Sequence, residues 1–194
     1  MKNLKKLKTP LRYPGGKSRA TKFLFDHLPE KITAYREPFV GGGSVAIEFS
    51  KRYPDIPVWV NDVYYNLFCF WSQLQKNNEA LYNAILSRKM KAESYDDKTT
   101  SHRHLFLESR DVLGKNIDPF NRAVHFFIAN KCSFSGLGES SGFSASASES
   151  NFSVNNINNL PKYLPLIENW TITNMDYAEV FAGCDRDDFI FADP

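Results

Sequence analysis

A glycine-rich turn in the first quarter of the chain constrains its fold more than any other feature. Gly41–Gly43 follow a short apolar segment, and Val45–Phe49 then reads as the start of a helix. Glycine is needed where the backbone turns tightly and where a ligand approaches a position that a Cβ would fill. Gly41, Gly43 and Ala46 match the G-x-G-x-x-A form of the nucleotide-binding turn. The pattern predicts a strand, a turn and a helix that form one nucleotide-binding unit.

A carboxylate follows this turn at the spacing that nucleoside-binding folds use. Val58–Val60 reads as the next strand, and Asp62 stands at its end, roughly 20 residues after the turn. Such folds place there the acid that accepts hydrogen bonds from ribose hydroxyls. The glycines alone would be equally consistent with a turn that merely connects a strand to a helix. Together with the acid, they favour a ligand that contains a nucleoside.

A second apolar segment ends in an acid and a proline. Asp187–Phe191 is typical of a buried strand, and Asp193-Pro194 follows it. Ligands of open α/β sheets bind at the carboxyl ends of strands. We therefore expect the glycine turn, Asp62 and Asp193 to lie together at one edge of a sheet.

A further glycine turn, Tyr13-Pro14-Gly15-Gly16-Lys17, lies near the N-terminus. It is not a phosphate-binding P-loop, because the first glycine of G-x-x-x-x-G-K-[ST] is absent. Taken alone, these residues most simply form a surface turn.

Taken together, these motifs resemble the Dam-type class of DNA adenine methyltransferases. They occur in the family's order, from about residue 8 to the last residue, and the motifs that carry the likeness are Tyr13–Lys17, Glu37–Ser44, Asn61-Asp62, Asp118–Val124, Asn130–Leu137 and Asp193-Pro194. One departure concerns the family's catalytic motif, Asp-Pro-Pro-Tyr, of which the sequence contains the first two residues. Because the sequence ends there, we expect the C-terminal part of the sheet to be missing and methyl transfer by residues 1–194 to be negligible.

The resemblance implies an α/β fold of the Rossmann-like type that S-adenosylmethionine-dependent methyltransferases share. It assigns residues 1–62 and 160–194 to the cofactor-binding and catalytic core. Residues 63–159 would form an inserted region of helices and loops that recognises DNA. The implied activity is transfer of a methyl group from S-adenosylmethionine to N6 of adenine in a short duplex DNA target.

The same resemblance implies roles for individual residues. The residues that would bind the cofactor are Tyr13, Gly16, Lys17, Glu37, Phe39, Gly41, Gly43, Asp62, Asp176 and Asp193. Asp176 would accept from the adenine amino group of the cofactor, although an acid after a strand as often caps a helix. Asp193 and the carbonyl of Pro194 would accept hydrogen bonds from the target amine, which returns electron density to its nitrogen. This chemistry requires no metal and no covalent intermediate.

Two interpretations compete for the serine- and glycine-rich segment Ser133–Asn159. Its composition favours a mobile loop, whereas the resemblance favours a DNA-contacting hairpin. The residues that would contact DNA are Asn130, Ser133, Phe134, Ser135, Gly136, Leu137 and Glu139. Phe134 would stack on a base or act as a wedge. Family members that methylate GATC carry a guanine-reading arginine where Glu139 stands, so we predict a different target, with Glu139 facing a cytosine amino group.

Helical spacing and capping signals organise the middle of the chain. Tyr64–Lys91 has apolar residues at helix-compatible spacing, and its aromatic residues are predicted to lie in the core. Lys89–Thr100 is polar and predicted to be a loop. Asp118 is suited to cap a helix that begins at Pro119. Towards the C-terminus, Trp170–Asn174 is predicted as a strand.

Composition limits the function less than the motifs do. The 194 residues carry a net charge of +2, too small to indicate nucleic acid. The lysines at the N-terminus, Lys2, Lys5, Lys6 and Lys8, would form either a solvated tail or a phosphate-contacting arm. Cys69, Cys132 and Cys184 are far apart, which predicts reduced thiols and no metal site. Without an apolar membrane span or signal peptide, we predict a monomeric cytoplasmic protein from a prokaryote or phage.

Other functions remain open from the sequence alone. A nicotinamide-dependent oxidoreductase would use the same turn and Asp62, but little chain is left for a second mononucleotide-binding half. A catalytically incompetent fragment that binds DNA or cofactor would fit the incomplete motif. Cytosine-N4 methyltransferases perform similar amine chemistry. For a methyltransferase, restriction–modification, phage self-protection and housekeeping methylation are all consistent with the sequence.

Overall fold

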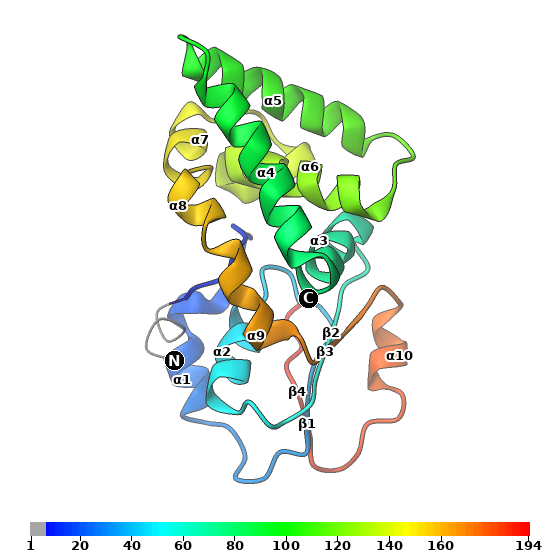
Figure 1. Cartoon of the computed structure of the whole chain (residues 1–194). Helices are drawn as coiled ribbons and strands as arrows, with labels where there is room; N and C mark the ends of the chain where they lie inside the picture. The colour runs from blue at the N-terminus through cyan, green and yellow to red at the C-terminus, as the bar shows by residue number, and fades with distance from the viewer. Residues whose placement is uncertain (1–6) are drawn as a thin grey trace.

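A parallel β-sheet forms one end of the molecule, and a group of helices forms the other (Figure 1). The computed structural model describes residues 7–194, apart from the side chain of Arg19. Lys2, Lys5 and Lys6 lie outside the described residues, so the prediction of a tail or an arm stays open for them. Lys8 is exposed, and its backbone carbonyl accepts a hydrogen bond from the Tyr163 hydroxyl.

Within the described residues the sheet has four strands. They are β1 (Ala34–Glu37), β2 (Val58–Asn61), β3 (Trp170–Thr173) and β4 (Asp188–Ile190). Their order is β3-β2-β1-β4 and all pairs are parallel, with Tyr35 opposite both Val58 and Phe189. Parallel neighbours joined by crossover helices are the mark of an α/β fold. The predicted fold class is therefore confirmed, as are the strands predicted around Val58, Trp170 and Phe189.

The described part of the chain also contains ten α-helices and four short 3₁₀ turns. The α-helices are α1 (Thr21–Phe25), α2 (Ser44–Arg52), α3 (Tyr65–Lys76), α4 (Asn78–Glu93), α5 (Lys98–Leu113), α6 (Pro119–Cys132), α7 (Ala145–Asn151), α8 (Val154–Ile157), α9 (Leu164–Ile167) and α10 (Tyr177–Phe181). The 3₁₀ turns are η2 (Lys17–Arg19), η3 (Phe134–Gly136), η4 (Gly138–Ser140) and η5 (Leu160–Tyr163). α2 connects β1 to β2, α10 connects β3 to β4, and α3–α9 lie between β2 and β3.

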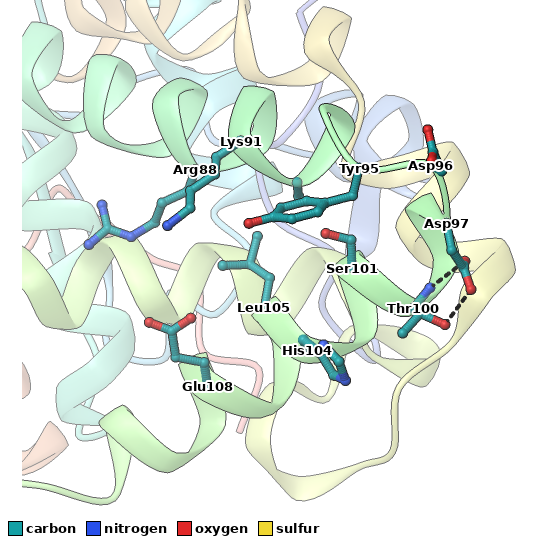
Figure 2. A pocket seen from close by; sticks show the side chains of 11 residues that line it. Arg88, Lys91, Tyr95, Asp96, Asp97, Thr100, Ser101, His104, Leu105 and Glu108 are labelled. Atoms are coloured by element: carbon teal, nitrogen blue, oxygen red, sulfur yellow. Dashed lines mark hydrogen bonds between the residues drawn. The ribbon is translucent and has the colours of Figure 1, made fainter.

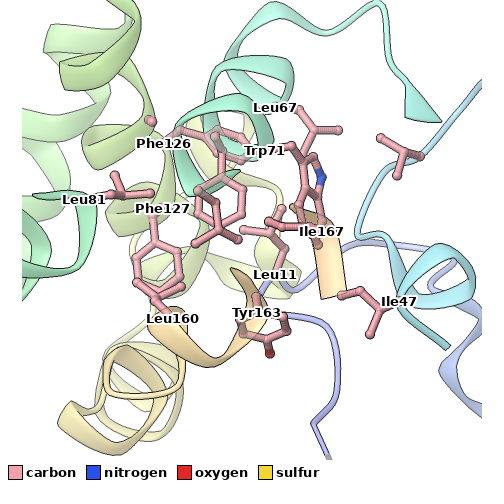
Figure 3. Close-up of a cluster of buried hydrophobic side chains, with 14 of the residues drawn as sticks. Leu11, Ile47, Leu67, Trp71, Leu81, Phe126, Phe127, Leu160, Tyr163 and Ile167 are labelled. Atoms are coloured by element: carbon pink, nitrogen blue, oxygen red, sulfur yellow. The ribbon is translucent and has the colours of Figure 1, made fainter. Parts of the chain in front are cut away.

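A single hydrophobic core runs from the sheet into the helices (Figure 3). Trp71 of α3 stands near its middle, with Ile47 of α2 towards the sheet and Phe127 of α6 among the helices. Phe70 and Trp71 are fully buried, so the core prediction is confirmed for them. It is wrong for Tyr65, which is 45% exposed because it opens α3 at the surface.

In the group of helices away from the sheet, the central helix is α6, which packs on α3 and α5. It begins as predicted: Asp118 accepts hydrogen bonds at 3.0 Å from the backbone N–H groups of Phe120 and Asn121, and Pro119 occupies the first turn. Its last eleven residues are all buried. The stretch Tyr64–Lys91 forms two helices, α3 and α4, which are separated at Asn77.

The polar stretch Lys89–Thr100 is mostly helical, so the predicted loop is wrong. α4 continues through Glu93, and α5 begins directly after Asp97. The Lys89 ammonium pairs with the Glu93 carboxylate at 2.5 Å, and Asp97 accepts a hydrogen bond from the Thr100 backbone N–H at 2.9 Å. Pairing and capping allow these polar residues to extend both helices.

Ser133–Asn159 is likewise more ordered than its composition predicts. It contains α7 and α8, and the Ser144 and Ser153 hydroxyls cap these helices by accepting from backbone N–H groups three residues later, at 3.2 and 3.3 Å. Phe152 between them is fully buried. The mobile-loop interpretation is wrong here, because serine serves as a helix cap as readily as a loop residue.

Candidate cofactor and DNA site

A cavity of about 190 Å³ lies at the carboxyl ends of β1 and β4. Most of the residues predicted to bind the cofactor or act in catalysis line it: Tyr13, Gly16, Lys17, Glu37, Phe39, Gly41, Asp193 and Pro194. Asp62 and Gly43 are not part of the lining, but the Asp62 carboxylate accepts a hydrogen bond from the Gly41 backbone N–H at 3.0 Å. The structure thus brings four separate motifs to one edge of the sheet.

The glycine turn fits tightly between two aromatic side chains. Gly41 and Gly43 have φ values of +46° and +67°, which L side chains rarely adopt. A Cβ on Gly41 would lie 3.0 Å from the Tyr13 ring, and a Cβ on Gly43 would lie 2.6 Å from the Trp71 ring. The Trp71 indole N–H also donates to the Gly41 carbonyl at 3.1 Å. The Cβ atoms would thus meet these rings, whereas the sequence suggested that the glycines leave room for a ligand.

Asp62 and Asn61 connect the carboxyl ends of neighbouring strands. Besides the Gly41 bond, Asp62 accepts from the Tyr64 backbone N–H at 3.0 Å, and burial raises the pKa of its carboxyl. The Asn61 amide donates to the carbonyls of Pro38 and Met175 at 3.1 and 3.0 Å. Asn61 is buried, so it holds the edge of the sheet together from inside.

Glu37 ends β1 with its carboxyl group almost fully buried. Its side chain accepts a hydrogen bond from the Tyr35 hydroxyl at 2.6 Å. Burial raises the pKa of Glu37 to about 8, and the nearby carboxylates of Asp193 and Asp62 act in the same direction. Glu37 is therefore mostly uncharged at neutral pH. The Tyr35 partner, two residues away on the same strand face, escaped the sequence analysis.

Asp193, the predicted catalytic carboxylate, pairs with Lys17. The ammonium nitrogen lies 2.5 Å from Asp193 Oδ2 and also donates to the Gly15 carbonyl at 3.0 Å. Both side chains are about one-third exposed, so the pair faces the cavity mouth. The sequence predicted each residue but not that they meet.

Asp176 lies outside the cavity lining. It is exposed and caps α10 by accepting from the Ala178 backbone N–H at 2.8 Å. The geometry of Asp176 therefore matches the alternative interpretation, that of a helix cap. Phe39, which lines the cavity, packs against Tyr177 with ring centres 5.5 Å apart.

The predicted DNA-contacting residues divide into buried and exposed ones. We call residues 133–143 the recognition segment. Asn130, Ser133 and Gly136 are buried, and the Asn130 amide binds both the N–H and the carbonyl of Arg12, at 3.0 and 2.6 Å, and the Gly136 carbonyl at 2.8 Å. The Arg12 guanidinium donates to the Ser133 carbonyl at 2.9 Å. These residues fasten the segment to the N-terminal turn.

Phe134, Ser135 and Leu137 project from the segment. Phe134 is 66% exposed and Leu137 is 45% exposed, so both apolar side chains face solvent. Ser135 between them has φ +53°. A non-glycine residue in the left-handed region marks a constrained backbone, and such constraint is common at binding sites.

Glu139 points into the protein. Its Oε1 accepts from the Tyr64 hydroxyl and from the Asn66 amide, the latter at 2.7 Å, while Oε2 is buried and has no hydrogen-bond partner among the described residues. Asn66 in turn accepts from the Arg122 guanidinium at 2.7 Å. A cavity of about 340 Å³ opens beside Glu139, with Tyr13 and Phe126 among its walls. No motif or spacing in the sequence indicated that this site includes Tyr64, Asn66 and Arg122.

A family model describes residues 13–194 as a D12 class N6 adenine-specific DNA methyltransferase. The chain belongs to this family. The resemblance inferred from the motifs is thereby confirmed, and so is the enzyme class. Methyltransferases of this type generally use S-adenosylmethionine, and DNA is the substrate of the family.

Curated relatives of the family cover most of this chain. A type II methyltransferase of Methanocaldococcus jannaschii is 25% identical, over 95% of this chain and 67% of its own length. A DNA adenine methylase of Vibrio cholerae is 24% identical, over 98% of this chain and 66% of its own length. The DNA adenine methylase of Escherichia coli K12 is 29% identical, over 69% and 44%. The chain spans about two thirds of the length of the first two relatives.

The cavity at the sheet edge fits the methionine end of S-adenosylmethionine. That end carries an ammonium and a carboxylate, and the cavity presents the Lys17 ammonium together with the carboxyl groups of Glu37 and Asp193.

In residues 7–194 no cluster of His, Cys, Asp and Glu could hold a metal ion. No helix in this part of the chain is long and apolar enough to cross a membrane.

Proposed function

We propose that this protein transfers a methyl group from S-adenosylmethionine to the N6 amino group of adenine within a specific duplex DNA site. The observation that carries the proposal is the convergence of the glycine turn, Glu37, Lys17 and Asp193 on one cavity, in a chain of this family. The protein would act as a monomer in the cytoplasm; both points are predictions from the sequence.

The chain would hold the cofactor along the edge of the sheet. Lys17 would bind the methionine carboxylate, and Glu37 would accept from the ammonium. Asp62, fixed by the Gly41 and Tyr64 backbone N–H groups at 3.0 Å, has lone pairs left for ribose hydroxyls. When bound, S-adenosylmethionine supplies an electrophilic methyl group. Tyr13, Phe39 and Asp176 would complete the site, Asp176 at the adenine amino group.

Asp193 and the Pro194 carbonyl would prepare the target amine. The lone pair of an exocyclic amine is delocalised into its ring, so the amine is a poor nucleophile. Two acceptors for its hydrogens return electron density to nitrogen and hold the nitrogen in line for methyl transfer. Asp193 is paired with Lys17 at 2.5 Å, so the amine would replace Lys17 as the partner of one carboxylate oxygen or share the carboxylate with it.

DNA recognition would use the exposed part of the recognition segment. Phe134 would stack on bases or act as a wedge when the target adenine leaves the duplex. Glu139 would accept from a cytosine amino group after its side chain turns out of the contacts with Tyr64 and Asn66. A carboxylate cannot donate to guanine, so we propose a target other than GATC.

Calorimetry with S-adenosylmethionine tests the cofactor assignment. We expect measurable binding, and Asp62→Ala should weaken it by about 1–3 kcal/mol through loss of charge-assisted ribose hydrogen bonds. Asp55→Ala removes an exposed carboxylate from the loop before β2 and serves as the matched control. Equal affinity for Asp62→Ala and wild type would contradict the assignment of Asp62, and tighter binding of NADH would contradict the proposed function.

Methylation mapping tests the target. The natural gene is expressed in a host whose DNA lacks adenine methylation, and modified bases are located by long-read sequencing. We expect N6-methyladenine at one short sequence other than GATC. Modification only at GATC would show that the interpretation of Glu139 is wrong, and N4-methylcytosine would overturn the adenine target.

A further inference from the structure

The helix α5 has a groove on each side of its buried stripe. The stripe consists of His102, Phe106, Ser109 and Leu113. One groove opens towards α4, and the other opens towards the recognition segment. The two grooves are similar in volume, about 730 and 690 Å³, but they differ in charge.

The groove towards α4 carries charges of both signs (Figure 2). Arg88 and Lys91 of α4 contribute its positive charges, and the carboxylates of Asp96, Asp97 and Glu108 line the same space. Figure 2 shows Glu108 on α5 below the Arg88 side chain, with the Tyr95 ring across the middle of the groove. An anion would meet these carboxylates, so the larger groove is a poor site for one.

The groove towards the recognition segment contains only positive charge. We call it the arginine groove, and its lining residues are Thr99, Thr100, Arg103, Phe106, Leu107, Arg110, Gly142, Phe143 and Ala145. Arg103 and Arg110 are exposed and stand seven residues apart, on one face of α5. Among the described residues, no carboxylate lies within 4.0 Å of either guanidinium. The Arg110 guanidinium rests 5.7 Å from the centre of the Phe106 ring.

The far wall of the arginine groove belongs to the segment that carries Phe134. The Gly142 carbonyl accepts a hydrogen bond from the Phe134 backbone N–H at 3.0 Å, and Phe143 forms an antiparallel bridge with Ser133. Phe143 also packs against Phe106 of α5, with ring centres 5.9 Å apart. Arg110 is thus connected to the exposed Phe134 through the Phe106 and Phe143 rings and then through backbone bonds of the recognition segment.

We propose that the arginine groove binds the sugar–phosphate backbone of duplex DNA beside the target site, with Arg103 and Arg110 each contacting a phosphate. The inference rests on the proposed function, which supplies the DNA. Seven helical residues separate the two arginines by about 10 Å, so the two side chains can reach different phosphates of one duplex. Guanidinium groups suit phosphate because their donors form a fixed fork. Such contacts set the position of the duplex and carry no sequence information.

The test compares two double variants that each lose two positive charges. Arg103→Ala with Arg110→Ala removes the arginine groove's cations, and Arg88→Ala with Lys91→Ala removes those of the groove towards α4. Binding to a fluorescent duplex that contains the mapped target is measured by anisotropy between 50 and 300 mM salt. Circular dichroism and S-adenosylmethionine calorimetry establish that each variant is folded.

For the arginine-groove variant we expect affinity to fall by about tenfold or more at 100 mM salt. Its plot of log affinity against log salt should be shallower by about 1.8, because each lost phosphate contact removes about 0.9 from the slope. The preference for target over non-target duplex should not change. Arg103→Lys with Arg110→Lys should keep the wild-type slope. The variant of the groove towards α4 should match wild type in both affinity and slope.

Each other outcome has a definite meaning. An unchanged slope in the arginine-groove variant would overturn this inference and leave the proposed function standing. Equal losses in the two double variants would also overturn it, because the effect would then follow net charge and not the groove. Absence of duplex binding by the wild-type protein would overturn the proposed function itself. If the double variant does not fold, the single variants are compared, with a slope change of about 0.9 expected for each.

Discussion

Two regions of the molecule are held in shape by different means. One is the recognition segment. The other is the edge of the sheet where β1, β2 and β4 end beside Gly41–Gly43, which we call the cofactor edge. At the cofactor edge, backbone geometry places most of the functional groups, since β1, β2 and β4 end together and a glycine turn follows β1; the Asn61 amide then ties the strand ends to one another. In the recognition segment, side chains do this work, and the Asn130 amide alone makes three hydrogen bonds. Neighbouring residues of one sequence motif therefore differ in role within the segment: some form internal hydrogen bonds, and others face solvent.

The largest expected effect tests the cofactor edge, through the pH dependence of stability. Glu37→Gln keeps the shape and the bond from Tyr35 but cannot ionise. Because burial raises the folded pKa from its ordinary 4.5 to about 8, the folded wild type retains a proton that the unfolded chain has released. The contribution of this bound proton to the free energy of unfolding is full below pH 4.5 and is lost as the pH rises through about 8. Between pH 5 and 8 the wild type should lose about 3 kcal/mol relative to Glu37→Gln.

Denaturant unfolding of both proteins at pH 5, 6, 7 and 8 measures this difference. The exposed Glu30, which lies before β1, provides the matched control substitution Glu30→Gln. Parallel curves for Glu37→Gln and wild type would mean that Glu37 is ionised in the folded protein at pH 7.

The next effect tests whether side chains hold the recognition segment. Asn130→Ala removes bonds to the N–H and carbonyl of Arg12 and to the Gly136 carbonyl, and leaves these groups without partners in a buried region. We expect a loss of about 2–3 kcal/mol in the free energy of unfolding. Thermal or chemical denaturation measures it. A loss below about 0.5 kcal/mol would show that the amide does not fasten the segment to the N-terminal turn.

The smallest effect concerns the exposed half of the same segment. Phe134→Ala should reduce affinity for duplex DNA by about 1–2 kcal/mol, because one stacking or wedging contact is lost. Its unfolding free energy should stay within about 0.5 kcal/mol of wild type, since the ring is 66% exposed. Anisotropy and denaturation measure the two quantities. The opposite pattern, lost stability with full DNA affinity, would mean that Phe134 stabilises the segment and does not contact DNA.

Local rules were sufficient to predict the glycine turn and the position of Asp62. The positive φ values of Gly41 and Gly43 and the position of Asp62 after β2 follow from turn chemistry and strand ends, which short stretches of sequence encode. The pairing of Lys17 with Asp193 did not follow, because the two residues meet only when the N-terminal turn packs over the end of β4.

The recognition segment was less predictable because its contacts are distant in sequence. Glu139 was predicted to face DNA, yet its partners Tyr64 and Asn66 lie more than seventy residues earlier. No periodicity or local motif reports such a bond. The predictions for Phe134 and Leu137 agree with their exposure, whereas Asn130, Ser133 and Gly136 serve internal hydrogen bonds that the motif alone does not reveal.

Tyr64 touches both acids that the proposed function assigns to different ligands. Its backbone N–H donates to Asp62, the proposed ribose ligand, and its hydroxyl donates to Glu139, the proposed base reader. A duplex that draws Glu139 away deprives Tyr64 of its partner and disturbs the residue that fixes Asp62. Thermodynamic linkage is reciprocal: by whatever factor the correct sequence changes affinity for the methyl donor, the donor changes affinity for that sequence. Through these two bonds Tyr64 would couple the two binding steps, and the coupling would be equally large whichever ligand binds first.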